Sequence, residues 1–123
     1  HNFVLQAVFE AQPAPAEEME RLLEAARARR KLSQPVGASA GCIFKNPPEI
    51  PAGRLIDELG LKGACVGDAC VSDVHANFII NRGHARARDI TILIDMIRKE
   101  AKENRGIDLK SEAQVIGDRD PQF

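Results

Sequence analysis

Three cysteines carry the most versatile chemistry in this sequence, because a thiol can bind a metal ion, form a disulfide or transfer a proton. Cys65, Cys70 and His75 follow one another at intervals of five residues, and Cys42 is a possible fourth ligand. Zinc sites commonly place paired cysteines two to four residues apart. Free cysteine is also among the most buried residue types, and both Cys65 and Cys70 have apolar neighbours. The pattern therefore predicts buried thiols and no metal site.

The number of cysteines bears on their oxidation state. An odd count of three, in a chain of 123 residues that is long enough to build its own core, argues against a disulfide scaffold. We therefore expect reduced thiols, as in the cytosol.

Cys42 differs from the other two cysteines because its neighbours are small or polar. Gly41 precedes it, and Lys45 and Asn46 follow it at a predicted junction of loop and strand. A positive setting lowers the pKa of a thiol from its reference value near 8.5 and makes proton exchange at neutral pH easier. A buried structural cysteine fits the same spacing equally well. The residues thus leave Cys42 open as a proton donor or a core residue.

Glu112 and His75 are two further residues with potentially catalytic side chains. Glu112 lies in a short predicted strand, where a carboxylate is normally just solvated, and only a partner from elsewhere in the fold would make it catalytic. A lone histidine such as His75 more commonly satisfies nearby backbone groups than binds a ligand. The residues alone leave both roles undecided.

Composition excludes several broad classes. A net charge of -1 with a pI near 6.3 gives no basic surface for nucleic acid, and five Phe are the only aromatic residues that could stack on bases. The glycines match neither the dinucleotide nor the nucleoside-triphosphate pattern, so this chain shows no cofactor fingerprint. No run of 18 apolar residues or signal peptide is present, which predicts a soluble, cytoplasmic protein without membrane contact.

The elements that must position these residues follow from apolar periodicity and breakers. Pro13 and Pro15 indicate a linker, and the first helix is expected to bury Met19, Leu22, Leu23 and Ala26. The order of elements favours an α+β fold in which a small sheet packs with about three helices. The pattern predicts helices over 17–32, 51–59 and 89–103, strands over 1–10, 41–45, 76–80 and 107–117, and an irregular strand region over 64–71. Asp89 can cap the third helix, Gly106 ends it, and its apolar stripe consists of Ile90, Leu93, Ile94, Ile97 and Ala101.

Four ordered motifs resemble the UDP-N-acetylenolpyruvoylglucosamine reductase (MurB) family, flavoenzymes that make UDP-N-acetylmuramate for peptidoglycan. The resemblance covers residues 2–117 and is carried by SAGCIFKNPP at 39–48, AGRLIDELGLKG at 52–63, VSDVHANFIIN at 71–81 and EAQVIG at 112–117. It implies that the chain is the C-terminal, substrate-binding domain of such a reductase, without the flavin domain. Residues 1–16 would then be the terminal strand and linker of the flavin-binding region, and residues 17–123 the substrate-binding domain.

The resemblance also implies roles for two residues in the reduction of UDP-N-acetylglucosamine enolpyruvate. In the family, NADPH reduces FAD, a hydride passes to C3 of the enolpyruvyl group, and an acid protonates C2. That acid is usually the last Ser of Ser-Ala-Gly-Ser, whose place Cys42 takes here. A thiol can also give a proton, since its reference pKa is closer to neutrality than that of a hydroxyl. The family's terminal Glu corresponds to Glu112, flanked here by Ser111 and Ala113 instead of Pro and Val.

Three further residues are implied to bind the substrate. Asn46 corresponds to a residue that contacts the sugar nucleotide, Lys31 to one that binds the diphosphate, and His75 to the position of the substrate carboxylate. Without the resemblance, the basic residues from Arg27 to Lys31 are explained by the favourable placement of positive charge at a helix C-terminus.

The implied partners are the substrate and the FAD-binding domain of the same enzyme, and the complete enzyme would use FAD and NADPH. The chain alone is expected to bind no FAD and to be inactive. The alternative is a non-catalytic interaction module that binds zinc or an anion through the three thiols and the basic cluster. A folded remnant without any ligand is a third interpretation.

Overall fold

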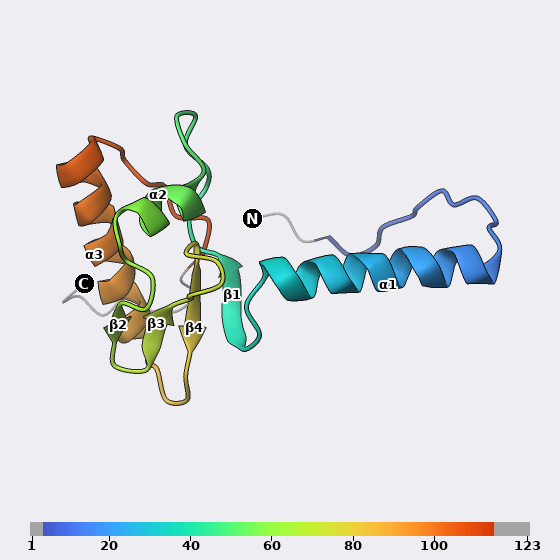
Figure 1. Ribbon diagram of the computed structural model, residues 1–123, viewed down its shortest axis with the longest axis horizontal. Helices are drawn as coiled ribbons and strands as arrows, with labels where there is room; N and C mark the ends of the chain where they lie inside the picture. Colours follow the sequence, from blue (N-terminus) through green and yellow to red (C-terminus); the bar gives the residue numbers. More distant parts are fainter. Residues whose placement is uncertain (1–3, 115–123) are drawn as a thin grey trace. The chain divides into compact units, whose positions relative to one another are not determined.

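The chain divides into two units, His1–Arg30 and Lys31–Phe123. The computed structural model describes residues 4–114, and each unit is described by itself (Figure 1). Within the described residues, no helix is long and apolar enough to cross a membrane.

The first unit consists of an extended segment followed by most of helix α1, Ala16–Ser33. The helix begins directly after Pro15, whose carbonyl oxygen accepts hydrogen bonds from the backbone N–H groups of Glu18 and Met19 at 3.1 Å. This confirms the predicted first helix and its proline-rich start. The prediction of a strand over residues 1–10 is not confirmed, because residues 4–10 form no helix or strand in this chain; residues 1–3 lie outside the described part.

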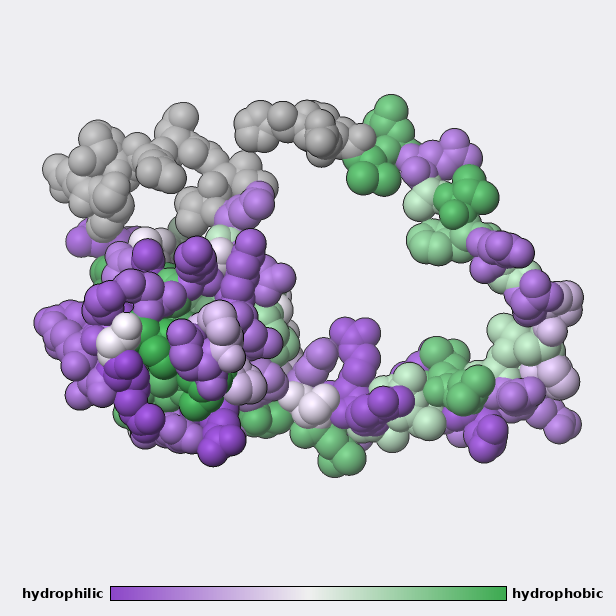
Figure 2. Space-filling model, turned by 90° about the horizontal axis from the view of Figure 1, so that it is seen from above, coloured by the Kyte–Doolittle hydropathy of each residue, from purple (hydrophilic) through white to green (hydrophobic). Residues whose placement is uncertain are grey.

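The predicted buried stripe of α1 is also wrong, because none of the helix's residues is buried. Met19, Leu22 and Leu23 are 50–58% exposed, and Leu5 and Phe9 in the preceding segment are 96% and 86% exposed. Figure 2 shows such side chains as green patches on the surface of this unit. An apolar stripe becomes buried only against a second apolar surface, and periodicity along one helix cannot show whether that surface is present.

The second unit is built on a four-stranded antiparallel sheet with the order β1-β4-β3-β2. Its strands are β1 Ala38–Cys42, β2 Cys65–Val66, β3 Ala69–Val71 and β4 Phe78–Asn81. Helix α2, Ala52–Glu58, contacts helix α3, Ala87–Arg105, and α3 packs against β2 and β3. The protein therefore has three helices and a four-stranded sheet, which confirms the predicted α+β class.

The core of this unit is aliphatic apart from Phe44 and Phe78, as a chain so poor in aromatic residues requires. The predicted stripe of the third helix is confirmed at Leu93, Ile97 and Ala101, which are all buried. Asp89, predicted to cap this helix, accepts a hydrogen bond from the Arg86 backbone N–H at 2.8 Å as part of a capping box. The fully buried large side chains come from every layer of the unit: Ile43, Phe44, Leu55, Ile56, Val71, Leu93, Ile97 and Leu109.

The irregular region expected at 64–71 is a hairpin whose two-residue turn begins at Gly67 with φ +55°. Its register places Cys65 directly opposite Cys70, with the two Cα atoms 4.1 Å apart, and the two sulfurs form a disulfide. The prediction of reduced thiols is therefore wrong for this pair. The prediction of burial is confirmed for Cys70 and wrong for Cys65, which is exposed. A count of cysteines cannot show the pairing, because it depends on the register that the turn fixes.

Segments after α3 complete the unit. Gly106 ends the helix in the left-handed conformation, as predicted. Instead of a full strand over 107–117, the described part contains one isolated bridge that joins Ser111 to Phe44 beyond the end of β1. The remainder of that predicted strand, from Val115, lies outside the described residues.

Candidate active site

Three of the five predicted site residues line one open cavity of about 340 Å³ in the second unit. Cys42 comes from the end of β1, Asn46 from the loop that leads to α2, and His75 from the turn before β4. Cys42 and His75, which are 33 positions apart in the sequence, thus line the same cavity because β1 and β4 are neighbours in the sheet.

Gly41 positions the Cys42 side chain. The pairing of β1 with β4 shifts register between Ser39 and Cys42, and Gly41 has a φ of +82° in this irregularity. Only glycine adopts such a φ without strain, and bulges of this kind redirect the side chain that follows. Cys42 is exposed as a result and is a free thiol, so it is no core residue.

The electrostatic surroundings of Cys42 correct the sequence prediction. Partial burial and then the nearby negative charge of Glu112 raise the pKa of the Cys42 thiol, while a hydrogen bond with the Asn77 side chain acts in the opposite direction. The expected lowering of this pKa by a positive setting is therefore wrong. A raised pKa keeps the proton on sulfur at neutral pH, which is the state that an acid needs.

Glu112 reaches Cys42 through backbone pairing. Its N–H donates to the Ile43 carbonyl oxygen at 2.7 Å, next to the Phe44–Ser111 bridge. Although Glu112 is exposed and is not part of the cavity lining, its charge acts on the Cys42 thiol. Cys42 is therefore the group from elsewhere in the fold with which Glu112 interacts.

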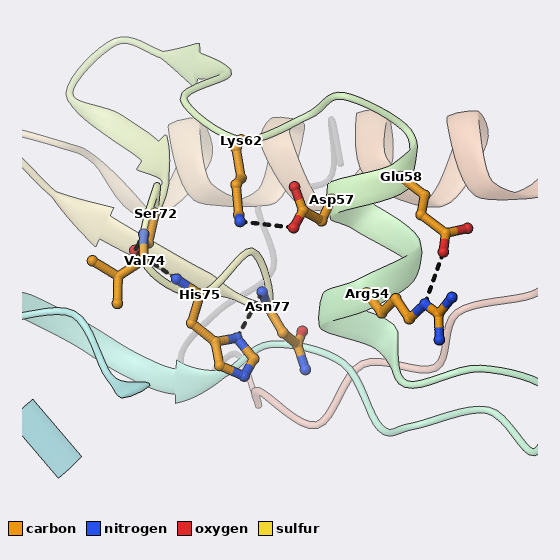
Figure 3. Close-up of polar contacts among 8 residues, drawn as sticks. All are labelled: Arg54, Asp57, Glu58, Lys62, Ser72, Val74, His75 and Asn77. Carbon is orange, nitrogen blue, oxygen red and sulfur yellow. Dashed lines mark hydrogen bonds and ion pairs between the residues drawn. The ribbon is translucent and has the colours of Figure 1, made fainter. Parts of the chain in front are cut away.

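His75 is held by three local contacts. Its backbone N–H donates to Ser72 Oγ at 3.3 Å, and its Nδ1 accepts a hydrogen bond from the Asn77 backbone N–H at 3.2 Å (Figure 3). Because Nδ1 acts as an acceptor, a neutral imidazole carries its proton on Nε2. Gly53 lies against the ring, where an added Cβ would be 2.8 Å from Cε1. His75 thus lines the cavity as a hydrogen-bond donor with a fixed tautomer.

Asn46 links the cavity to helix α2. Its Oδ1 accepts a hydrogen bond from the backbone N–H of Ala52, the first residue of the helix, at 3.0 Å. The side-chain oxygen is therefore used within the fold, and the amide nitrogen is the group that Asn46 has for a ligand.

The cavity wall also contains charged residues that the sequence analysis did not single out. Arg54 pairs with Glu58 at 2.8 Å, and Lys62 with Asp57 at 2.7 Å; Figure 3 shows both pairs on and beside α2. The Arg54–Glu58 spacing of four residues is a recognisable helical ion pair. Only the fold, however, shows that Arg54, Asp57 and Lys62 face a cavity.

Lys31, like Glu112, is a predicted site residue that does not line this cavity. It is exposed in the last turns of α1.

Metal binding finds no support among the described residues. No group of three or more His, Cys, Asp or Glu residues in residues 4–114 is arranged to hold a metal ion. The sulfurs of Cys65 and Cys70 are bonded to each other and are therefore unavailable as thiolate ligands. The zinc-module interpretation thus loses the two ligands on which it depended.

Comparisons with known proteins show which family this chain is similar to. A family pattern described as "UDP-N-acetylenolpyruvoylglucosamine reductase, C-terminal domain" matches residues 30–116. The chain is 45% identical over 114 residues to the reductase of that name from Syntrophobacter fumaroxidans, covering 92% of this chain and 33% of the relative. It is 53% identical over 89 residues to the corresponding protein from Chloroflexus aggregans, covering 72% and 30%.

A solved structure gives the same result. The crystal structure of UDP-N-acetylenolpyruvylglucosamine reductase (MurB) from Thermus caldophilus superimposes with a TM-score of 0.68 at 48% sequence identity, covering 85% of this chain and 36% of that chain. Fold and sequence thus define a domain of an oxidoreductase. The chain belongs to the UDP-N-acetylenolpyruvoylglucosamine reductase family and corresponds to its C-terminal domain. It spans about a third of the length of these relatives.

Proposed function

We propose that this chain is the substrate-binding part of a reductase that converts UDP-N-acetylglucosamine enolpyruvate to UDP-N-acetylmuramate in peptidoglycan synthesis. The observation that carries the proposal is the juxtaposition of the Cys42 thiol and the Glu112 carboxylate next to an open polar cavity. Family membership supports the reaction class.

In this proposal Cys42 is the acid that protonates C2 of the enolpyruvyl group. The raised pKa of its thiol keeps the proton in place until C2 becomes basic, and the exposed sulfur can regain a proton from solvent afterwards. The Glu112 charge contributes to the raised pKa and therefore favours the proton-carrying form of Cys42.

Cavity residues bind and orient the substrate in this proposal. His75 offers an Nε2–H donor to the substrate carboxylate, and Asn46 offers its amide nitrogen to the sugar nucleotide. Arg54 and Lys62 are the cations of the wall that would contact the diphosphate, in exchange for their present ion pairs with Glu58 and Asp57. We assign the diphosphate contact of Lys31 on the family resemblance alone.

FAD and NADPH belong to the complete enzyme in this proposal, and the described residues offer no phosphate-binding glycine loop for either. When bound, the flavin supplies the hydride to C3. We assign FAD to a domain that precedes residues 17–123, with residues 1–16 as its terminal strand and linker. The exposed apolar side chains of the first unit support a partner surface there. The chain alone would be inactive, and the complete enzyme would work in the cytoplasm.

Substrate titration tests binding. Adding UDP-N-acetylglucosamine enolpyruvate to the ¹⁵N-labelled 123-residue chain should shift the amide resonances of Asn46 and His75 together with Cys42. UDP-N-acetylglucosamine, which lacks the enolpyruvyl group, should leave Cys42 unshifted. Absence of any shift in the cavity residues with the enolpyruvate at millimolar concentration would contradict the binding role.

Turnover tests the chemistry. The chain is joined behind the flavin-binding portion of the Thermus caldophilus reductase, and substrate-dependent oxidation of NADPH is followed. Cys42→Ser should remain active because a hydroxyl can serve as the acid, whereas Cys42→Ala should lose about 100-fold or more in kcat. Equal kcat values for Cys42→Ala and the parent would remove Cys42 from the mechanism.

A further inference from the structure

A buried amide next to Cys42 has no role in the mechanism described so far. Asn77 is 3% exposed, lines the same cavity as Cys42, and directly precedes β4. The sequence analysis included it in a family motif without assigning it a function.

Backbone pairing between β1 and β4 stops where Asn77 begins. Cys42 is the last residue of β1 and pairs with Phe78, and the next contact is the Ile43 N–H with the Asn77 carbonyl oxygen at 2.9 Å. The chain then turns away through His75, whose carbonyl oxygen accepts a hydrogen bond from the Phe78 N–H at 3.0 Å. Beyond this point β4 offers no backbone partner to Phe44.

The Asn77 side chain takes the place of the missing strand. Its Oδ1 accepts a hydrogen bond from the Phe44 backbone N–H at 2.9 Å, and its Nδ2 donates to the Phe44 carbonyl oxygen at 2.8 Å. Both contacts are buried and span 33 residues of sequence. One amide therefore satisfies both backbone groups of Phe44, as a neighbouring strand would.

The same backbone segment also holds Glu112. On its other side Ile43 accepts the Glu112 N–H at 2.7 Å, and the Lys45 N–H donates to the Lys110 carbonyl oxygen at 2.9 Å. The segment 43–45 is thus held between Asn77 and residues 110–112. Any displacement of this segment would move Cys42 and Glu112 relative to each other.

The amide has one more donor for the thiol. A side-chain amide nitrogen carries two hydrogens, and the Phe44 carbonyl uses one of them. Asn77 and Cys42 line the same cavity, and interaction with the Asn77 side chain acts to lower the thiol pKa against the raising effects of burial and of the Glu112 charge. Of the ionisable groups near Cys42, including the cavity residues His75 and Lys62, Glu112 is the one whose charge shifts this pKa.

We propose that Asn77 is a positioning residue for Cys42: its amide fixes the segment 42–44 in place of a strand and donates its second hydrogen to the Cys42 sulfur. The acid function of Cys42 rests on the proposed function, but the contact does not require it. The consequence is that Asn77 opposes Glu112 in setting how firmly the thiol holds its proton.

The test measures alkylation of Cys42 by iodoacetamide as a function of pH in the 123-residue chain, with mass spectrometry to locate the label. Cys42 is the free thiol among the three cysteines when the disulfide is intact. Asn77→Ala should slow alkylation at pH 8 roughly three- to tenfold, because the thiolate loses a donor. Asn77→Asp, which has the same shape but no donor and can carry a negative charge, should slow it more.

Asn81→Ala is the matched control. Asn81 lies at the other end of β4, and its side chain also makes two hydrogen bonds to the backbone, both accepted by Oδ1, from Gly83 at 2.9 Å and Ala85 at 3.0 Å. Removal of the Asn81 side chain should destabilise the fold without changing the pH dependence of Cys42 alkylation. Equal pH profiles for Asn77→Ala and Asn81→Ala would reduce Asn77 to a structural residue and overturn the proposal.

A measurement on the unchanged protein keeps the proposal falsifiable if the Asn77 variants do not fold. The ¹⁵N shift of the Asn77 side-chain amide should titrate with the same midpoint as Cys42 alkylation, and this titration should vanish in Cys42→Ala. A pH-independent amide between pH 7 and 10 would refute the contact. None of these readouts uses turnover, so a failed reductase assay with intact alkylation results would reject the proposed function and leave the role of Asn77 standing.

Discussion

Gly53→Ala should separate stability from ligand binding in this protein. A Cβ at Gly53 would lie 2.8 Å from Cε1 and 3.2 Å from Nδ1 of His75. Ordinary contacts between carbon atoms are about 3.5–4.0 Å, so the imidazole must move by several tenths of an ångström. The movement should break the 3.2 Å hydrogen bond between the Asn77 N–H and Nδ1.

Two opposing effects determine how much Gly53→Ala changes the free energy of unfolding. Gly53 is the second residue of α2, and alanine in a helix is favoured over glycine by up to about 1 kcal/mol. Loss of the hydrogen bond to Nδ1 costs about 1 kcal/mol. The free energy of unfolding in urea should therefore change by less than about 1 kcal/mol. Affinity for UDP-N-acetylglucosamine enolpyruvate should fall about tenfold, because His75 no longer presents Nε2–H correctly.

A double-mutant cycle isolates the clash. In a His75→Ala background the ring is absent, so Gly53→Ala should stabilise the chain by up to about 1 kcal/mol and leave ligand affinity unchanged. The reasoning is refuted if Gly53→Ala alone leaves both affinity and the His75 ring nitrogen resonances unaltered, or if it destabilises equally in both backgrounds.

Three further changes have defined outcomes. In Gly41→Ala no atom lies within 4 Å of the new Cβ, so the cost is that of the left-handed backbone conformation alone. The free energy of unfolding in urea should fall by about 1–2 kcal/mol, as much as in Gly106→Ala. Of these two variants, only Gly41→Ala should alter Cys42 alkylation. Glu112→Gln removes a negative charge that raises the Cys42 pKa, so alkylation at pH 8 should accelerate; a slower reaction would reverse the assigned sign. Reduction of the Cys65–Cys70 disulfide should lower the free energy of unfolding by about 2 kcal/mol, and iodoacetamide should label one cysteine before reduction and three after it.

Local signals predicted the helices and the fold class well. Proline before α1, Gly106 after α3 and the apolar spacing of Leu93 and Ile97 are properties of neighbouring residues, and all are confirmed. The α1 stripe failed because its burial requires a partner surface, which no local pattern contains. The disulfide was missed because it depends on a hairpin register.

The site was predictable only in part, because it too depends on contacts between residues that are far apart in the sequence. The family resemblance indicated Cys42 and Glu112, but the direction of the thiol pKa depends on burial and on the charge of a carboxylate that lies 70 positions away in the sequence. Asn77 was overlooked because an asparagine before an apolar strand is also typical of an ordinary turn. Its hydrogen bonds to a residue 33 positions away are visible only in the folded chain.

The docking of residues 110–112 onto the segment 43–45 has a consequence for protein synthesis. On the ribosome Cys42 is added 70 residues before Glu112, so while those residues are being added the sulfur exists without the carboxylate that helps to retain its proton. A nascent chain therefore lacks the pairing of Cys42 with Glu112 until Glu112 has been added, however early its sheet forms. Only a polypeptide extended past Glu112 and released from the exit tunnel acquires it.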